Sequence, residues 1–249
     1  MNLKKLYYQK IKNSNIEIIK LALNILNINK IETIHYEMRA NILVSSNLCT
    51  IDEDKNKLSC YSSVSDIFET VLYNDPSKIY YKQFNNITKN ACKNCKPGNL
   101  KENHSFLSVD INILALCGLK KIQESIDNCF IEQENNTCPT CNSNYESIFD
   151  YNDHHLIIDI NSLSHEDYLN DYNLSLNDMF LNDIPITIKV KQKNYRISGF
   201  SSYTPEHYVS YVYNTINWKI YDDLNCIKDV HKNDKICPHI IMYICDDNF

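Results

Sequence analysis

The stretch YRISGFSSYTPEHYVSYVYNTINWKIYDDL, residues 195–224, decides the fold of this 249-residue chain. Aromatic and β-branched residues recur along it in short runs, and turn residues separate the runs. Such spacing predicts a series of antiparallel strands. The runs IPITIKVKQ (184–192) and PHIIMYIC (238–245) on either side have the same strand composition. We therefore expect most of the chain from residue 184 onward to be β-structure.

Helical patterns dominate the chain before this sheet. Apolar residues recur at helical spacing in three segments, at 14–29, 62–72 and 117–130. Strand patterns lie between and after them, at 104–113 and 154–163. The polar run CTIDEDKNK (49–57) is expected to be a loop. Because helices come first and an antiparallel sheet last, the predicted fold class is α+β.

Charge and hydropathy narrow the classes of partner. The formal net charge of −6 argues against a nucleic-acid partner, which would require a basic surface. It also argues against an anionic membrane, and no segment has the length and hydropathy of a membrane span or a signal peptide. We therefore expect an intracellular protein, cytoplasmic or nuclear, with no nucleic-acid and no membrane partner. In a reducing compartment its 11 cysteines would be thiols or metal ligands.

Two CxxC pairs suggest a metal site. Cys92 and Cys95 form the first pair, and Cys138 and Cys141 form the second. The two-residue spacing lets both thiolates of a pair reach one ion, so the four together predict a closed, structural, tetrahedral zinc site. Four further cysteines stand in apolar surroundings and are expected to be buried as small hydrophobic side chains: Cys117, Cys129, Cys237 and Cys245.

One histidine and one aspartate are candidates for acid–base chemistry. His207 lies in a strand-like run, and Asp222 follows the next such run. Two antiparallel strands would bring the two side chains together, and a carboxylate beside an imidazole fixes its tautomer and raises its basicity. A structural histidine, with Asp222 and Asp223 forming a turn, is the alternative interpretation of the same residues.

The C-terminal stretch resembles the ubiquitin-specific proteases, which are papain-like deubiquitinases. The family pattern is a "Y-x-L-x-G" strand, then "GHY-x-A-Y", then "W-x-x-F-D-D". The residues that fall into this order are Tyr195, Gly199, His207, Tyr208, Tyr211, Trp218, Tyr221, Asp222 and Asp223. The resemblance implies that His207 is the general base, that Asp222 orients it, and that Asp223 is a secondary polar contact.

The resemblance extends back to about residue 30. QFNNITKNACKNC is similar to the segment that opens the family's zinc-binding fingers, and CYSSVSDIFETVL is similar to its "QQD" helix. It implies one papain-like domain, with a helical thumb in 1–85, zinc fingers in 86–150 and a β palm in 151–249. The implied reaction is thiol-dependent hydrolysis of the isopeptide bond after ubiquitin or a ubiquitin-like protein such as SUMO.

The nucleophile of that reaction is harder to place. The chain has no cysteine before Cys49, whereas the family's cysteine box opens the catalytic domain. Cys60, in SCYSSV, is the candidate nucleophile, but the same residues also match the "QQD" helix. Cys49 lies in the polar run and is interpreted as an exposed bystander. Either the box precedes this chain or the domain has lost it, in which case the alternative function is a non-catalytic module that binds a ubiquitin-like protein.

The residue before the histidine departs from the family pattern. Glu206 stands where the family has glycine, which gives room for the di-glycine tail of the substrate because no side chain blocks two approaching backbones. A third interpretation is a zinc scaffold unrelated to proteases, in which His207 and Asp222 would lie far apart.

Overall fold

The computed structural model describes the following parts of the chain: residues 17–28, 32–52, 57–59, 64–65, 67, 70, 87–90, 94–95, 101–104, 106–109, 113–114, 117–131, 136–138, 140–145, 149–151, 155–160, 179–190, 192–204, 207–222 and 228–246. The chain divides into two compact units, residues 1–83 with 248–249 and residues 84–247. No helix in the described ranges is long and apolar enough to cross a membrane.

The described part of the first unit contains helices α2 and α3, a short hairpin, and further helical residues at 64–65, 67 and 70. Helix α2 (Glu17–Ile28) confirms the amphipathic helix predicted at 14–29. Helix α3 (Thr33–Ser45) begins where the backbone N–H of Glu32 donates to Nδ1 of His35, at 2.9 Å. Strands β1 (Thr50–Asp52) and β2 (Lys57–Ser59) then pair antiparallel, so the loop predicted at 49–57 is wrong at residues 50–52 and 57, and its residues 53–56 lie outside the described ones. Backbone hydrogen bonds form this hairpin, and a polar sequence can make them as well as an apolar one.

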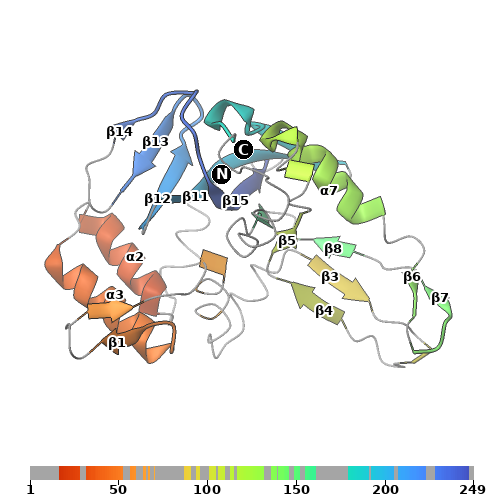
Figure 1. Ribbon diagram of the computed structural model, residues 1–249, viewed down its shortest axis with the longest axis horizontal. Helices are drawn as coiled ribbons and strands as arrows, with labels where there is room; N and C mark the ends of the chain where they lie inside the picture. The colour runs from red at the N-terminus through yellow and green to blue at the C-terminus, as the bar shows by residue number, and fades with distance from the viewer. Residues whose placement is uncertain are drawn as a thin grey trace. The chain divides into compact units, whose positions relative to one another are not determined.

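An eight-stranded sheet forms the body of the second unit (Figure 1). The strand order is β14-β13-β12-β11-β15-β9-β5, and β10 pairs with β11 outside this path. All pairs are antiparallel except β5 with β9. The strands are β5 (Leu107–Ser108), β9 (His155–Asp159), β10 (Thr187–Val190), β11 (Lys193–Thr204), β12 (His207–Tyr213), β13 (Trp218–Tyr221), β14 (Lys228–Asp229) and β15 (Pro238–Cys245). The predicted C-terminal sheet is confirmed.

Burial along the strands follows their place in the sheet. In β10 exposed and buried residues alternate, which is the pattern of a strand with one face in solvent. In β9, between β15 and β5, four successive residues are buried, so both of its faces are covered. Three aromatic side chains from neighbouring strands pack together on one face of the sheet. The rings of Phe200 on β11 and Tyr211 on β12 stack with centroids 4.5 Å apart, and Trp218 on β13 contacts Phe200 edge-on at 5.4 Å.

Helix α7 covers part of this unit. A short 3-10 turn (Leu119–Lys121) leads into α7 (Ile122–Ile131), which confirms the helix predicted at 117–130. Ile122 and Ile126 lie one turn apart and both belong to the buried core.

The same helix also closes an edge of the sheet. The side-chain amide of Gln123 donates to the backbone oxygen of Lys189 at 2.8 Å, and its oxygen accepts the N–H of Lys189 at 2.7 Å.

Smaller strands complete the second unit. β3 (Ile87–Asn90) pairs antiparallel with β4 (Lys101–His104) and with β8 (Phe149–Tyr151), and β6 (Asn136–Thr137) pairs with β7 (Asn144–Tyr145). The single strand predicted at 104–113 is largely wrong, because among its described residues His104 ends β4, Leu107–Ser108 forms the separate strand β5, and residues 113–114 are helical. The fold class α+β is therefore correct, whereas thumb, fingers and palm stay predicted subdivisions.

Candidate functional site

The two acid–base candidates lie at the same end of neighbouring strands. β12 begins at His207, and Asp222 directly follows β13. The register pairs Ser210 with Tyr221. His207 precedes Ser210 by a few residues and Asp222 directly follows Tyr221, so both candidates are near this pair. The hairpin that the prediction required is present. The contact between imidazole and carboxylate stays a prediction, because the side chain of His207 lies outside the described residues.

The neighbouring strands bring a second histidine to this end of the sheet. Tyr203 on β11 pairs with Tyr208 on β12, and the hydroxyl of Tyr208 lies 2.8 Å from Nδ1 of His239 on β15. The rings of Tyr203 and Tyr208 contact the imidazole of His239 at centroid distances of 6.2 and 5.2 Å. Successive strand residues alternate between faces, so this cluster, which contains Tyr208, lies on the opposite face of the sheet from position 207.

Burial keeps His239 neutral. Its exposed fraction is 1%, and this burial lowers the pKa of the imidazole to about 4. Its Nε2 is buried and has no hydrogen-bond partner within the described residues. The protonated ring carries an N–H at both nitrogens, and a buried cation whose Nε2–H has no acceptor among the described residues is costly. His239 thus serves as a neutral partner of Tyr208 at ordinary pH.

The remaining catalytic candidates have different outcomes. Asp223 and Cys60 lie outside the described residues. Cys49 is 8% exposed, so its interpretation as an exposed bystander is wrong. The turn after α3 explains the burial, since Asn47 has a left-handed φ of 57° and the N–H of Leu48 bonds back to the oxygen of Leu43 at 3.0 Å. This turn folds the chain back onto the helix.

Three of the four predicted ligand cysteines meet in space. The sulfur atoms of Cys95, Cys138 and Cys141 all lie within 4.8 Å of one another, and those of Cys95 and Cys138 are 3.5 Å apart. A tetrahedral zinc ion with Zn–S bonds of about 2.3 Å would hold its sulfurs about 3.8 Å apart. The spacing fits such an ion, so the cluster could hold a metal. Cys92 lies outside the described residues.

The local backbone explains how the second pair of thiols converges. The N–H of Cys138 donates to the oxygen of Ser143 at 3.0 Å, and the N–H of Asn142 donates to the oxygen of Cys138 at 2.8 Å. Asn142 has a left-handed φ of 56°, which asparagine tolerates better than most residues. The knuckle between β6 and β7 therefore turns back within a few residues and brings Cys141 beside Cys138.

Hydrogen bonds shift the pKa values of two of the three thiols in opposite directions. Backbone N–H groups of Cys141 and Thr140 lower the pKa of the Cys138 thiol. Contacts with Cys141 and Cys138 raise the pKa of the Cys95 thiol to about 12. A bound divalent cation reverses such an increase, because a coordinated thiol is deprotonated.

The other cysteines were predicted to be buried, with mixed results. Cys245 is buried, whereas Cys129 and Cys237 are partly buried. Cys117 is exposed, so its prediction is wrong. It lies at the end of a short helical stretch, directly before the left-handed Gly118, and this break places it at the surface.

Searches by sequence match no protein-family model and no curated protein. Comparison of structures gives low-identity matches from Saccharomyces cerevisiae. The Pan2 pseudoubiquitin-hydrolase shares 14% identity at a TM-score of 0.43, over 85% of this chain and 70% of that chain. A Pan2 pseudoubiquitin hydrolase–RNA exonuclease module in complex with RNA shares 13% identity at a TM-score of 0.43, over 74% of this chain and 37% of that chain.

The likeness concerns the fold. The chain is similar to divergent ubiquitin-hydrolase-like domains, and its place among the ubiquitin-specific proteases stays a prediction. It spans little more than a third of the longer modules.

The predicted exclusion of nucleic acid is corrected by this comparison. Several of the similar modules were solved in complex with RNA, so the predicted exclusion of a nucleic-acid partner is wrong. The exclusion rested mainly on the net charge of −6. A net charge sums over the whole surface and does not describe one face of it.

His239 is a buried residue at this end of the sheet that sequence reasoning missed. The run PHIIMYIC was interpreted only as an apolar strand, and a single histidine in such a run carries no spacing signal. The pairing of β15 with β11, which joins Ser202 to Pro238, brings His239 to Tyr208. Such a contact depends on sheet order, which local periodicity does not encode.

Proposed function

We propose that the chain is a ubiquitin-hydrolase-like domain in which His207 is the general base and Asp222 the residue that orients it. The reaction of such a site is thiol-dependent hydrolysis of the isopeptide bond after a ubiquitin-like C-terminus. The thiolate attacks the carbonyl carbon, the base moves the proton to the leaving amine, and water then releases the acyl group.

One observation carries the proposal. Tyr211 and Ile220 are cross-strand partners on β12 and β13. Every second residue of a strand points to the same face, so position 207 shares a face with Tyr211, and position 222 shares a face with Ile220. Because Tyr211 and Ile220 are cross-strand partners, both positions belong to the same face of the sheet. A motif that matched by chance would have no reason to place its histidine and aspartate at one end and on one face of adjacent strands.

A four-cysteine zinc site is the finer proposal for the metal centre. Cys92 would complete the set formed by Cys95, Cys138 and Cys141, and the closed tetrahedral site would stabilise the fold without taking part in the reaction. An intracellular location agrees with cysteines that remain thiols or ligands.

The alternative is a pseudoenzyme that binds a ubiquitin-like protein without cleaving it. The burial of Cys49, at 8% exposure, favours this alternative, because a nucleophile must be reachable by its substrate. Only Cys60 then remains as a nucleophile candidate from the sequence.

Mass spectrometry after reaction with a ubiquitin probe and a SUMO probe tests both functions. Each probe carries a thiol trap at its C-terminus. An adduct at Cys60 that disappears in Cys60→Ser and slows in His207→Ala would support the hydrolase, with His231→Ala as the matched control because His231 is exposed. Saturable binding without an adduct would support the pseudoenzyme.

Absence of both binding and adduct formation for a folded, metal-loaded chain would contradict the two functions together. The same preparation is measured for binding to a short RNA, since nucleic acid is no longer excluded.

A further inference from the structure

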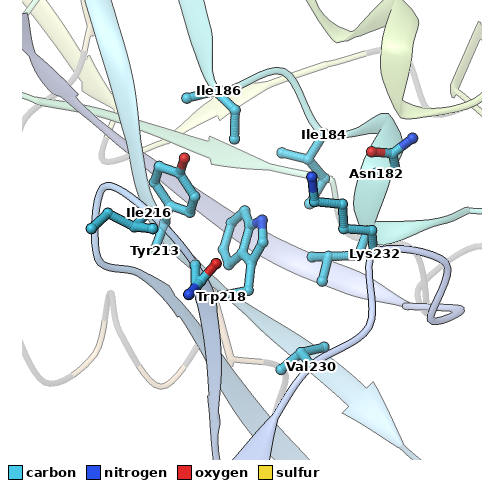
Figure 2. Close-up of a pocket in the computed structure, with 10 residues that line it drawn as sticks. Asn182, Ile184, Ile186, Tyr213, Ile216, Trp218, Val230 and Lys232 are labelled. Carbon is cyan, nitrogen blue, oxygen red and sulfur yellow. The ribbon is translucent and has the colours of Figure 1, made fainter.

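The second unit contains a pocket at the opposite end of the β12–β13 hairpin from His207. Its volume is about 380 Å³, which lies toward the lower end of the ~300–1,000 Å³ range of small-molecule sites. Ile184, Ile186, Ile216 and Val230 surround the indole of Trp218 (Figure 2). Nothing proposed above for His207, Asp222 or the cysteine cluster uses this pocket.

Hydrogen bonds made by the backbone and by the Asn214 side chain hold the walls of the pocket in place. On one side, the N–H of Asn182 donates to the oxygen of Lys232 at 2.8 Å. On the other, Oδ1 of Asn214 accepts the N–H groups of Ile216 and Asn217, at 3.2 and 2.8 Å, and so closes the hairpin turn. The pocket is therefore formed before a ligand arrives, which lowers the entropic cost of binding.

The pocket offers several hydrogen-bond donors: the Trp218 indole and the Lys232 ammonium only donate, whereas the Tyr213 hydroxyl and the amides of Asn182 and Asn217 can donate or accept. Among the described residues of the lining, Lys232 alone is charged, although the chain as a whole has a net charge of −6. The hydroxyl of Tyr213 and the ammonium of Lys232 both project to the Ile186 side of the indole (Figure 2). In the described part of the chain, the indole N–H of Trp218, the Tyr213 hydroxyl and the Lys232 ammonium make no hydrogen bond or ion pair with protein.

This combination defines the chemistry of a ligand. An apolar wall with an aromatic floor favours an aromatic or branched aliphatic body. A cation next to an indole N–H and a phenol favours an anionic acceptor, and a carboxylate can accept from several such donors at once. We propose that the pocket binds a small carboxylic acid, with its apolar body against Trp218 and its carboxylate toward Lys232.

Tryptophan fluorescence tests the proposal directly. Trp218 is the only tryptophan of the chain, so its emission reports on this pocket alone. The full-length protein is titrated with 3-phenylpropionate and, as the matched neutral compound, with 3-phenylpropanamide at constant ionic strength. We expect a saturable change with the acid and an affinity about tenfold lower for the amide, as expected for the loss of one charge-assisted hydrogen bond.

Three variants separate the charge from the apolar wall. Lys232→Gln should abolish the preference for the acid over the amide, whereas Lys189→Gln, at an exposed residue outside the lining, should preserve it. Ile216→Ser, at a side chain that is 78% exposed, should weaken both ligands alike without unfolding the protein. The proposal is overturned by the absence of a saturable change with the acid, by equal affinities for acid and amide, or by an unchanged preference in folded Lys232→Gln.

Discussion

A Cβ atom on Gly199 would lie 2.3 Å from the backbone oxygen of Tyr211. Gly199 pairs with Val212 across β11 and β12, and the register with β15 shifts between Ile197 and Gly199. The neighbouring strand therefore passes too close for any side chain. This contact gives a structural reason for the glycine of the "Y-x-L-x-G" pattern.

The change Gly199→Ala should lower the free energy of unfolding by about 3 kcal/mol, because backbone rather than a flexible side chain would have to move. Urea denaturation of the two proteins measures the difference. Ser198→Ala is the matched control at the adjacent, partly buried position, and its effect should be smaller. Equal stabilities of Gly199→Ala and the natural chain would show that the strands can separate at little cost.

Metal binding should depend on Cys141 but not on Cys117. Both cysteines are exposed, and only Cys141 belongs to the sulfur cluster. After zinc loading and removal of free ion, Cys141→Ser should bind zinc at least about tenfold more weakly than the natural chain, since the variant lacks one of the sulfur atoms that coordinate the metal. Cys117→Ser should retain the natural zinc content. A chain without bound zinc, or equal zinc contents in the two variants, would contradict a metal centre at this cluster.

The stability of the protein should decrease as the pH is lowered from 6.5 to about 4, because of His239. In the unfolded chain its pKa is near 6.5, whereas in the folded state burial lowers it to about 4. Between these two values the unfolded state takes up a proton that the native state does not, so the free energy of unfolding is undiminished above pH 6.5 and falls as the pH drops toward 4.

The size of this effect can be isolated by mutation. The part of the fall due to His239 is about 2 kcal/mol, and it should disappear in His239→Asn. Urea denaturation between pH 7.5 and 4.5 measures the slope, with His231→Asn as the control at an exposed histidine. Identical slopes in the natural chain and in His239→Asn would show that folding leaves the pKa of this imidazole unchanged.

The turn of the β12–β13 hairpin carries backbone strain. Thr215 has a φ of 79°, a left-handed conformation that costs a residue with a side chain about 1–2 kcal/mol. Thr215→Gly should therefore raise the free energy of unfolding by about 0.5–1 kcal/mol, after the greater entropy of unfolded glycine is deducted. Thermal denaturation measures the gain. The same replacement at Ile216, where φ is not positive, should bring no gain, and a loss of stability in Thr215→Gly would contradict the strain.

Local pattern was enough to predict the sheet, because its strands follow simple periodicities. Residues of β10 alternate between exposed and buried, and α7 buries residues one helical turn apart. Other elements have no such pattern. Helix α3 has buried side chains only at His35 and Ile42 among its described residues, so its sequence shows no continuous apolar stripe.

The parts of the site that were predicted are those with fixed spacing along the chain. Each CxxC pair specifies its own knuckle, and three of the four thiols do meet. The pocket around Trp218 and the contact of Tyr208 with His239 combine residues from strands that are far apart in sequence. Sheet order brings them together, and sheet order follows from the global balance of burial rather than from any short segment.

The hydrogen bonds of Gln123 with Lys189 have a consequence for how the protein behaves in concentrated solution. An uncovered strand edge is a template on which a second chain can add a strand and begin aggregation. At Lys189 a side-chain amide occupies both the donor and the acceptor that such a strand would use. Gln123 on α7 thereby blocks the addition of a further strand at this position of the edge. Local unfolding of that helix would expose the edge to self-association.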